Sequence, residues 1–177
     1  MNTLEIQSIL QQETTTTIEA LELFDQLDTV GLEFMIGRWQ GSGFNSNHQM
    51  DGLLETIGWY GKEFVDQDLV HPLLFADGNE IFKVDPNPVI TEIGLGLSIL
   101  QHKSLQPLYQ GMSKMLKTEK SKARIRMMEY RDHLSATMIY DYLPIHDVFR
   151  KIDDNTVFGL MDWKGMSQPF FFILKRT

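Results

Sequence analysis

The 177-residue sequence contains no cysteine. That absence excludes disulfide bonds, a thiolate nucleophile, and metal or iron–sulfur sites that need cysteine ligands. It fits a reducing compartment, and we expect the protein to be cytoplasmic.

Basic residues are missing from the first part of the chain. Residues 1–37 hold seven of the 24 acidic residues and none of the 16 Lys and Arg residues, and the net charge of the whole chain is −8. Non-specific nucleic-acid binding depends on basic side chains that neutralise phosphates, so we expect no nucleic-acid partner. The start also lacks the basic and apolar regions of a signal peptide, so we expect none.

Long hydrophobic runs are absent as well. No apolar run approaches the ~20 residues that a membrane-spanning helix needs, so we expect no membrane span. The hydrophobic fraction is nevertheless 42%, which provides enough apolar residues for a core. A chain of this length suits one domain, and we expect a single β-rich domain at 31–177 preceded by a helical segment at 1–30.

The stretch from Gly37 to Gly43 reads Gly-Arg-Trp-Gln-Gly-Ser-Gly. In a strand, positions 37, 39, 41 and 43 share one face, so Trp39 supplies the only bulk on that face. Glycine permits close approach or a sharp bend, and a buried Trp needs a partner for its ring N–H. The pattern predicts a first strand whose Trp39 plugs one end of a curved sheet or barrel. A single buried Trp beside a loop is the simpler alternative.

The N-terminal segment has helical patterning. Thr16 and Glu19 have the spacing of a capping box. An apolar face follows at helical spacing, formed by Ile18, Leu21, Phe24 and Leu27 with Leu23 beside them. We predict an acidic amphipathic helix at 17–28 that packs across one end or face of the sheet, with docking of a partner as the alternative. A shorter helix is predicted at 3–11.

The rest of the chain is typical of antiparallel strands. Asp77-Gly78 between two apolar-rich runs is a hairpin signal. From residue 122 the pattern predicts a meander of strands at 122–131, 134–142, 145–152, 155–162 and 168–175. Short strands with tight turns favour a sheet or barrel over parallel βαβ units. The expected fold is therefore α+β but mostly β, an antiparallel barrel or strongly curved sheet with N-terminal helices packed on it.

The segment Gly37–Gly43 resembles the GXWXG signature of a bacterial family of unknown function. The stretch from Ala123 to Phe172 resembles the second conserved region that accompanies it, carried by 124–131, 136–141 and 144–151. The resemblance covers roughly residues 30–176 and brings no established activity. The Gly-x-Trp element is also similar to that of calycins, which include lipocalins, fatty-acid-binding proteins and haem-binding nitrobindins. This similarity implies a calycin-like, lipocalin-like β-barrel.

Candidate ligand-binding residues fall in two regions. Gly58 to Phe64 places two aromatics and a lysine between glycines, so Trp59 or Tyr60 could form a wall and Lys62 could contact an anion. A close-packed turn is the alternative. The later strands carry polar residues on both faces, which fits a barrel interior with polar groups aimed at a ligand. The candidates there are Arg126, Met128, Tyr130, Tyr140, Asp141 and His146.

Asp141 and His146 flank a turn and could approach each other as an orienting carboxylate and a titratable imidazole. A hydrogen-bonded turn clamp is the alternative. For Arg126, an internal ion pair is as plausible as ligand contact, because an uncompensated buried charge is costly. The histidines form no zinc motif, so we expect no metal site.

These features favour binding of a small, largely hydrophobic molecule in a barrel cavity, without a cofactor. The resemblance to nitrobindins implies an alternative, a haem or nitric-oxide protein in which His146 is the first candidate ligand. A second alternative is an enzyme that uses the region of Tyr140, Asp141 and His146, with Arg126 as an anion contact. A third is an interaction protein that uses the acidic helix. The sequence is compatible with a homodimer.

Overall fold

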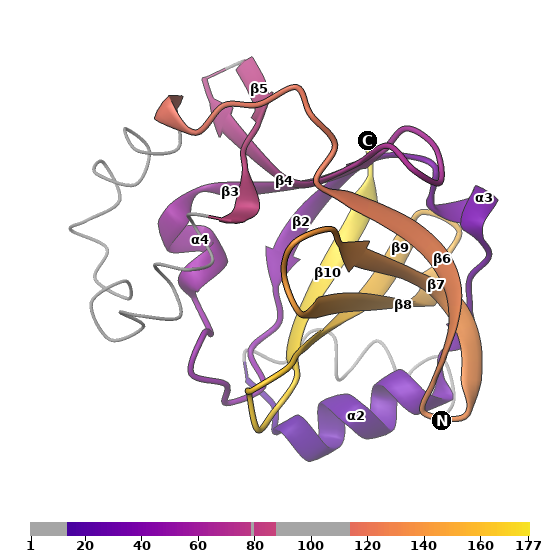
Figure 1. Ribbon diagram of the computed structural model, residues 1–177. Coiled ribbons are helices and arrows are strands. Elements are labelled where there is room, and N and C mark those ends of the chain that lie inside the picture. Colours follow the sequence, from indigo (N-terminus) through magenta and orange to yellow (C-terminus); the bar gives the residue numbers. More distant parts are fainter. Residues whose placement is uncertain (1–13, 79, 88–113) are drawn as a thin grey trace.

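The computed structural model describes residues 14–78, 80–87 and 114–177 (Figure 1). The helix predicted at 3–11 lies outside the described residues. The helices within them are α2 (Thr17–Gln26), α3 (Leu32–Met35) and α4 (Leu53–Ile57). The strands are β1 (Asp28–Thr29), β2 (Gly37–Gly43), β3 (Trp59–Phe64), β4 (Val70–Asp77), β5 (Glu80–Lys83), β6 (Ala123–Tyr130), β7 (His133–Tyr140), β8 (Ile145–Asp153), β9 (Thr156–Trp163) and β10 (Phe170–Arg176).

Eight antiparallel strands close into a barrel. They follow the order β8-β7-β6-β4-β3-β2-β10-β9, and the pairing of β8 with β9 completes the circle. The short strands β1 and β5 pair with two strands of the barrel, β1 with β8 and β5 with β4. The predicted mostly-β antiparallel fold is confirmed.

The predicted hairpins are present. Strands β4 and β5 flank the turn at Gly78, whose φ of +60° is one that glycine adopts without strain. Strands β6 to β10 form the meander that the turn residues indicated, with β6–β7, β7–β8, β8–β9 and β9–β10 pairing in sequence order. Local alternation and turn chemistry therefore predicted the strands of the second half of the chain.

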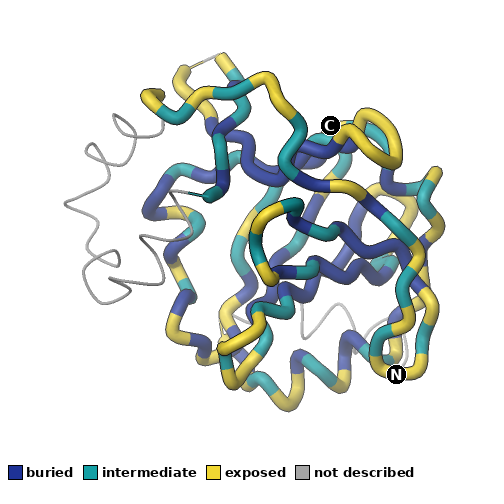
Figure 2. The backbone as a smooth tube through the Cα atoms, in the orientation of Figure 1, coloured by how far each residue is buried: buried dark blue, intermediate teal, exposed yellow. Residues whose placement is uncertain are grey.

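The barrel has an apolar interior and a second apolar cluster on its outer face. Figure 2 shows that buried residues run along most of the barrel strands. Three consecutive phenylalanines of β10 contribute to both clusters. Phe170 and Phe172 pack in the interior, and Phe171 packs in the outer cluster. Helix α2 covers the outward ring with Phe24, whose ring centroid lies 6.5 Å from that of Phe171. The predicted amphipathic helix thus packs on the outer face of the barrel.

A capping box begins α2. The Thr16 side chain accepts from the backbone N–H of Glu19, and the Glu19 carboxylate accepts from the backbone N–H of Thr16 at 2.9 Å. These two bonds satisfy helix donors that would otherwise lack partners. The helix then buries Ala20, Leu23 and Phe24.

Trp39 closes one end of the barrel. Its side chain is fully buried, and its ring N–H donates to the carbonyl of Met35 in α3 at 2.8 Å. The Arg176 guanidinium lies 4.2 Å from the centroid of the same ring and donates to the carbonyls of Phe34 and Ile36. The prediction of a Trp plug with a partnered ring N–H is confirmed.

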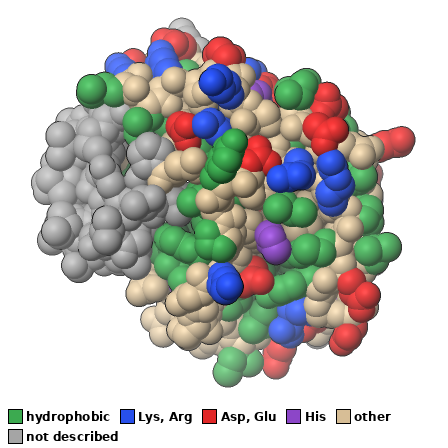
Figure 3. Space-filling model, viewed as in Figure 1, with side chains coloured by type: hydrophobic (Ala, Val, Ile, Leu, Met, Phe, Trp, Pro, Cys, Tyr) green, Lys and Arg blue, Asp and Glu red, His purple; other side chains and the backbone are tan. Residues whose placement is uncertain are grey.

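Among the described residues, no helix is both long and apolar enough to cross a membrane. Figure 3 shows acidic and basic side chains interspersed on the viewed face of the protein.

Candidate functional site

The end of the barrel opposite Trp39 contains a cavity. Its wall comes from α4, from the loop before it, and from strands β3, β4, β7, β8, β9 and β10. The lining is mainly apolar: Met50, Leu53, Leu54, Ile57, Trp59, Lys62, Leu73, Tyr140, Ile145, Asp147, Met161, Trp163, Phe170 and Phe172. A few polar groups within an apolar wall are typical of small-molecule sites.

The cavity is small, with a volume of about 50 Å³. Ligand pockets span roughly 300–1,000 Å³. Side chains of its wall would therefore have to move to admit a molecule the size of a single ring.

A β-bulge brings two side chains of β3 into the cavity. Trp59 and Lys62 are three residues apart, a spacing that would place them on opposite faces of a regular strand. The pairing of β3 with β4 shifts register on both sides of Gly61, so both side chains point inward. A Cβ on Gly61 would overlap the carbonyl oxygen of Trp39, and only glycine fits this position.

Lys62 and Asp147 form a buried ion pair. Lys62 Nζ lies 2.7 Å from Asp147 Oδ2, and the side chains are only 4% and 1% exposed. The ammonium also donates to the carbonyl of Pro72 at 3.3 Å. It lies 5.4, 5.8 and 5.1 Å from the ring centroids of Trp59, Tyr140 and Phe172. Three aromatic faces therefore help to compensate the loss of water around the cation.

Burial governs the titration of the two acidic groups in this cluster. It raises the pKa of Asp147, although the Lys62 ammonium favours the carboxylate. Burial also raises the pKa of Tyr140 well above its usual value, and the nearby Asp147 charge acts in the same direction. Tyr140 is therefore a neutral phenol at physiological pH, and the cluster has one cation and one titratable carboxyl group.

Two polar atoms of this cluster are buried without a hydrogen-bond partner. They are Trp59 Nε1, a donor, and Asp147 Oδ1, an acceptor. Both residues line the cavity. Leaving such an atom unsatisfied costs about 1–3 kcal/mol, so these atoms are candidates to bind a ligand.

Three of the predicted site residues meet at the cavity: Trp59, Lys62 and Tyr140. Tyr60 is half-buried and is not part of the lining. Lys62 was expected to contact an anion, but its anion is the carboxylate of Asp147.

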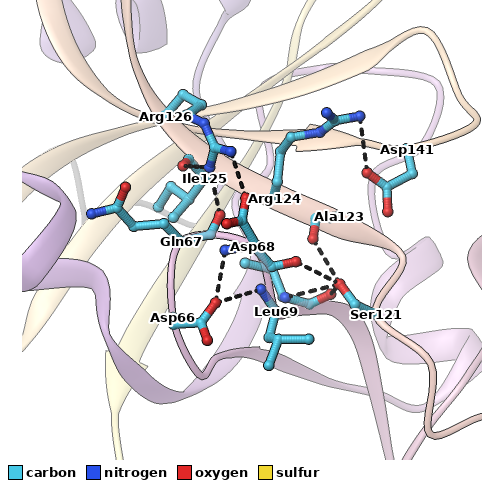
Figure 4. Close-up of polar contacts among 11 residues, drawn as sticks. Asp66, Gln67, Asp68, Leu69, Ser121, Ala123, Arg124, Ile125, Arg126 and Asp141 are labelled. Carbon is cyan, nitrogen blue, oxygen red and sulfur yellow. Dashed lines mark hydrogen bonds and ion pairs between the residues drawn. The ribbon is translucent and has the colours of Figure 1, made fainter.

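Arg126 and Asp141 are not among the residues that line the cavity. Figure 4 shows the polar contacts that they make instead. Arg126 forms an ion pair with Asp68 and donates to the carbonyl of Gln67 at 2.7 Å. Asp141 forms an ion pair with Arg124 at 3.2 Å. Both ion pairs are partly exposed to solvent. Arg126 is therefore neither an internal charge nor part of the cavity.

The remaining predicted residues face outward. Met128 and Tyr130 pack against the outer apolar cluster that α2 covers. His146 is half-buried on β8 between Ile145 and Asp147, which both point into the cavity. Alternation therefore directs the imidazole to the outer face. The structure does not bring Tyr140, Asp141 and His146 together.

Sequence reasoning missed Asp147. Its alternation with Ile145 and Phe149 was visible, and those two apolar neighbours indicated the inward face of the strand. Asp147 interrupts that apolar face, which is the signal that could have identified it. His146 was predicted as a site residue because imidazole is a common catalytic group. It shares its face of the strand with Val148 and Arg150, not with Asp147.

A second hollow lies beside the start of α2. It has a volume of about 470 Å³ and is lined by Thr14, Thr15, Thr16, Asn45, Asn47, Asp51 and Gly52. Its Thr15 and Thr16 hydroxyls already bond Glu19 in the helix cap. The apolar cavity at Lys62 and Asp147 is therefore the stronger candidate site.

Comparisons with known proteins give two family matches. A family model described as "GXWXG protein" matches residues 22–79. A second, described as "Domain of unknown function (DUF4334)", matches residues 121–176. No curated protein matches the chain.

The chain is also similar to a solved structure, described as the crystal structure of a protein from Thermomonospora curvata. The two share 30% sequence identity with a TM-score of 0.68, over 93% of this chain and 89% of that one. The barrel strands that carry Trp39, Trp59 and Lys62 lie within the first family match, and those that carry Tyr140 and Asp147 lie within the second.

Proposed function

This chain belongs to the GXWXG family, and we propose that it binds a small, largely hydrophobic molecule in the cavity of its barrel. The observation that carries the proposal is the apolar cavity together with two buried, unpartnered polar atoms, Trp59 Nε1 and Asp147 Oδ1, on residues that line it. Apolar surface supplies affinity, and a few fixed polar groups supply orientation.

The composition of the wall supports an apolar ligand. Met50 and Met161 have flexible thioether side chains that adapt to varied apolar shapes. Leu54 of α4 is half-buried and lines the cavity. A ligand larger than the cavity would extend toward this partly exposed side.

The alternatives receive less support. The haem alternative named a histidine as the iron ligand, and none of the described residues that line the cavity is a histidine. His146 points to the outer face, and His102 lies outside the described residues. The enzyme hypothesis relied on Tyr140, Asp141 and His146 acting at one place, but only Tyr140 lines the cavity.

Methionine-methyl NMR provides the test. The protein is labelled at its methionine methyl groups and titrated with a panel of small uncharged compounds, including toluene, cyclohexanol and cyclohexanone. We expect the resonances of Met50 and Met161 to shift, because these residues line the cavity. Met115 and Met127, which are 86% and 39% exposed, serve as internal controls that should not shift.

Two matched variants locate the binding. Leu54→Trp places a large ring at the cavity, and we expect it to weaken binding by about tenfold through steric exclusion, equivalent to roughly 1.4 kcal/mol. Leu134→Trp adds the same ring at a position that is 57% exposed and should bind like the wild type. A wild-type protein that binds no compound of the panel, or a Leu54→Trp protein that binds all of them normally, would contradict the proposal.

A further inference from the structure

We infer that the ligand is a neutral apolar molecule with a hydroxyl group, which donates to Asp147 Oδ1, while Trp59 Nε1 donates to an oxygen of the same molecule. This inference rests on the proposed binding function and specifies the chemistry of the ligand's polar end.

Asp147 requires a donor. Oδ2 accepts the Lys62 ammonium at 2.7 Å, but Oδ1 is buried and has no partner. A carboxylate has about four acceptor sites, so one ion-pair contact leaves the second oxygen free to accept an O–H. A hydrogen bond between a hydroxyl and a charged acceptor is stronger than one between neutral groups.

Trp59 requires an acceptor. Its six-membered ring lies against Gly41, where a Cβ would overlap two of its carbons. Glycine at this position therefore lets the indole ring approach β2 closely. The indole N–H, which can only donate, is buried and unpartnered, and the residue lines the cavity. An oxygen atom of a ligand would satisfy it.

The charges of the cluster disfavour an ionic ligand. A carboxylate ligand would lie close to the Asp147 carboxyl group. The Lys62 ammonium could not compensate its charge, because it is already paired with Asp147. An ammonium would meet Lys62, which already occupies the space over the faces of Trp59, Tyr140 and Phe172. A like charge in so buried a place is costly. A neutral alcohol satisfies the donor and the acceptor without adding charge.

The test compares four compounds with the same ring and different polar ends: benzyl alcohol, toluene, benzoate and benzylamine. Each is titrated into the full-length protein while the indole N–H resonances of its three tryptophans are followed by NMR. The Trp59 resonance is assigned from the spectrum of Trp59→Phe. We expect benzyl alcohol to bind about tenfold more tightly than toluene, as one hydrogen bond to a charged acceptor predicts. We expect benzoate and benzylamine to bind more weakly than toluene, and the Trp59 resonance to move downfield with the alcohol.

Variants separate the two hydrogen bonds from general packing. The double variant Lys62→Met/Asp147→Leu removes the acceptor together with its cation, and Trp59→Phe removes the donor but keeps an aromatic ring in the wall. Each should bring the affinity for benzyl alcohol close to that for toluene. Tyr60→Phe, on the same strand but outside the lining, should keep the wild-type preference. If toluene or benzoate binds as tightly as benzyl alcohol, the inference is wrong but the binding function stands. If none of the four compounds binds, both are wrong.

Discussion

At the scale of single residues, the glycines of the GXWXG motif have distinct tasks. Trp39 is the plug of one barrel end, and its ring N–H is held by the carbonyl of Met35. Gly41 makes room for a different tryptophan. The ring of Trp59 occupies the space that a larger side chain at position 41 would fill. The motif therefore links the closed end of the barrel to the cavity at the other end.

Replacing Gly41 should be costly. Gly41→Ala forces its methyl group against Trp59, and overpacking of this kind costs about 1–3 kcal/mol. We expect urea denaturation to show this loss together with a change in tryptophan fluorescence. Gly31→Ala is the matched control, since nothing lies within 4 Å of a Cβ there and φ is −85°. Equal stability of the two variants would contradict this account of the motif.

At the scale of elements, the loop before α4 is fixed by a small polar cluster. Asp51 accepts from the backbone N–H groups of Ser46 and His48, and His48 Nδ1 accepts from that of Met50 at 3.1 Å. The His48 ring lies 5.5 Å from that of Phe170, a cavity residue. This loop holds α4 against the mouth of the cavity.

Acid should loosen this loop through His48. Burial lowers the pKa of His48 below its ordinary value of 6.5, so the native state favours the neutral ring. Its contribution to stability is complete above pH 6.5 and is lost as the pH falls through the lower native pKa. We expect the unfolding free energy of the wild type to fall more steeply below pH 6.5 than that of His48→Gln. Parallel pH profiles of the two proteins would exclude this role.

At the scale of the whole molecule, the ion pair connects distant parts of the barrel. Lys62 is on β3 and Asp147 is on β8, and strands β4, β6 and β7 separate them along one side of the sheet. The 2.7 Å contact therefore crosses the interior. Their attraction depends on barrel closure, and removal of one partner leaves a buried charge.

A double-mutant cycle measures this coupling. Lys62→Met should destabilise the protein by about 3–5 kcal/mol, because Asp147 loses its counter-ion. The double variant Lys62→Met/Asp147→Leu should be more stable than the single one, since it removes both charges. Chemical denaturation of the wild type, both single variants and the double variant gives the interaction energy. Simple additivity would show that the two side chains do not stabilise each other.

The sequence by itself determined the local features of this protein: the capped helix at Thr17–Gln26, the Gly78 turn, the strands of the meander and the Trp39 plug. Capping, turn chemistry and alternation each act within a few residues, so one sequence reveals them. Only the tertiary structure decided which strand faces turn inward, because β6 and β8 carry polar residues on both faces. It also decided that a bulge at Gly61 aligns Trp59 with Lys62 and that Lys62 meets Asp147. Such pairings depend on closure of the barrel, which joins residues far apart in the chain.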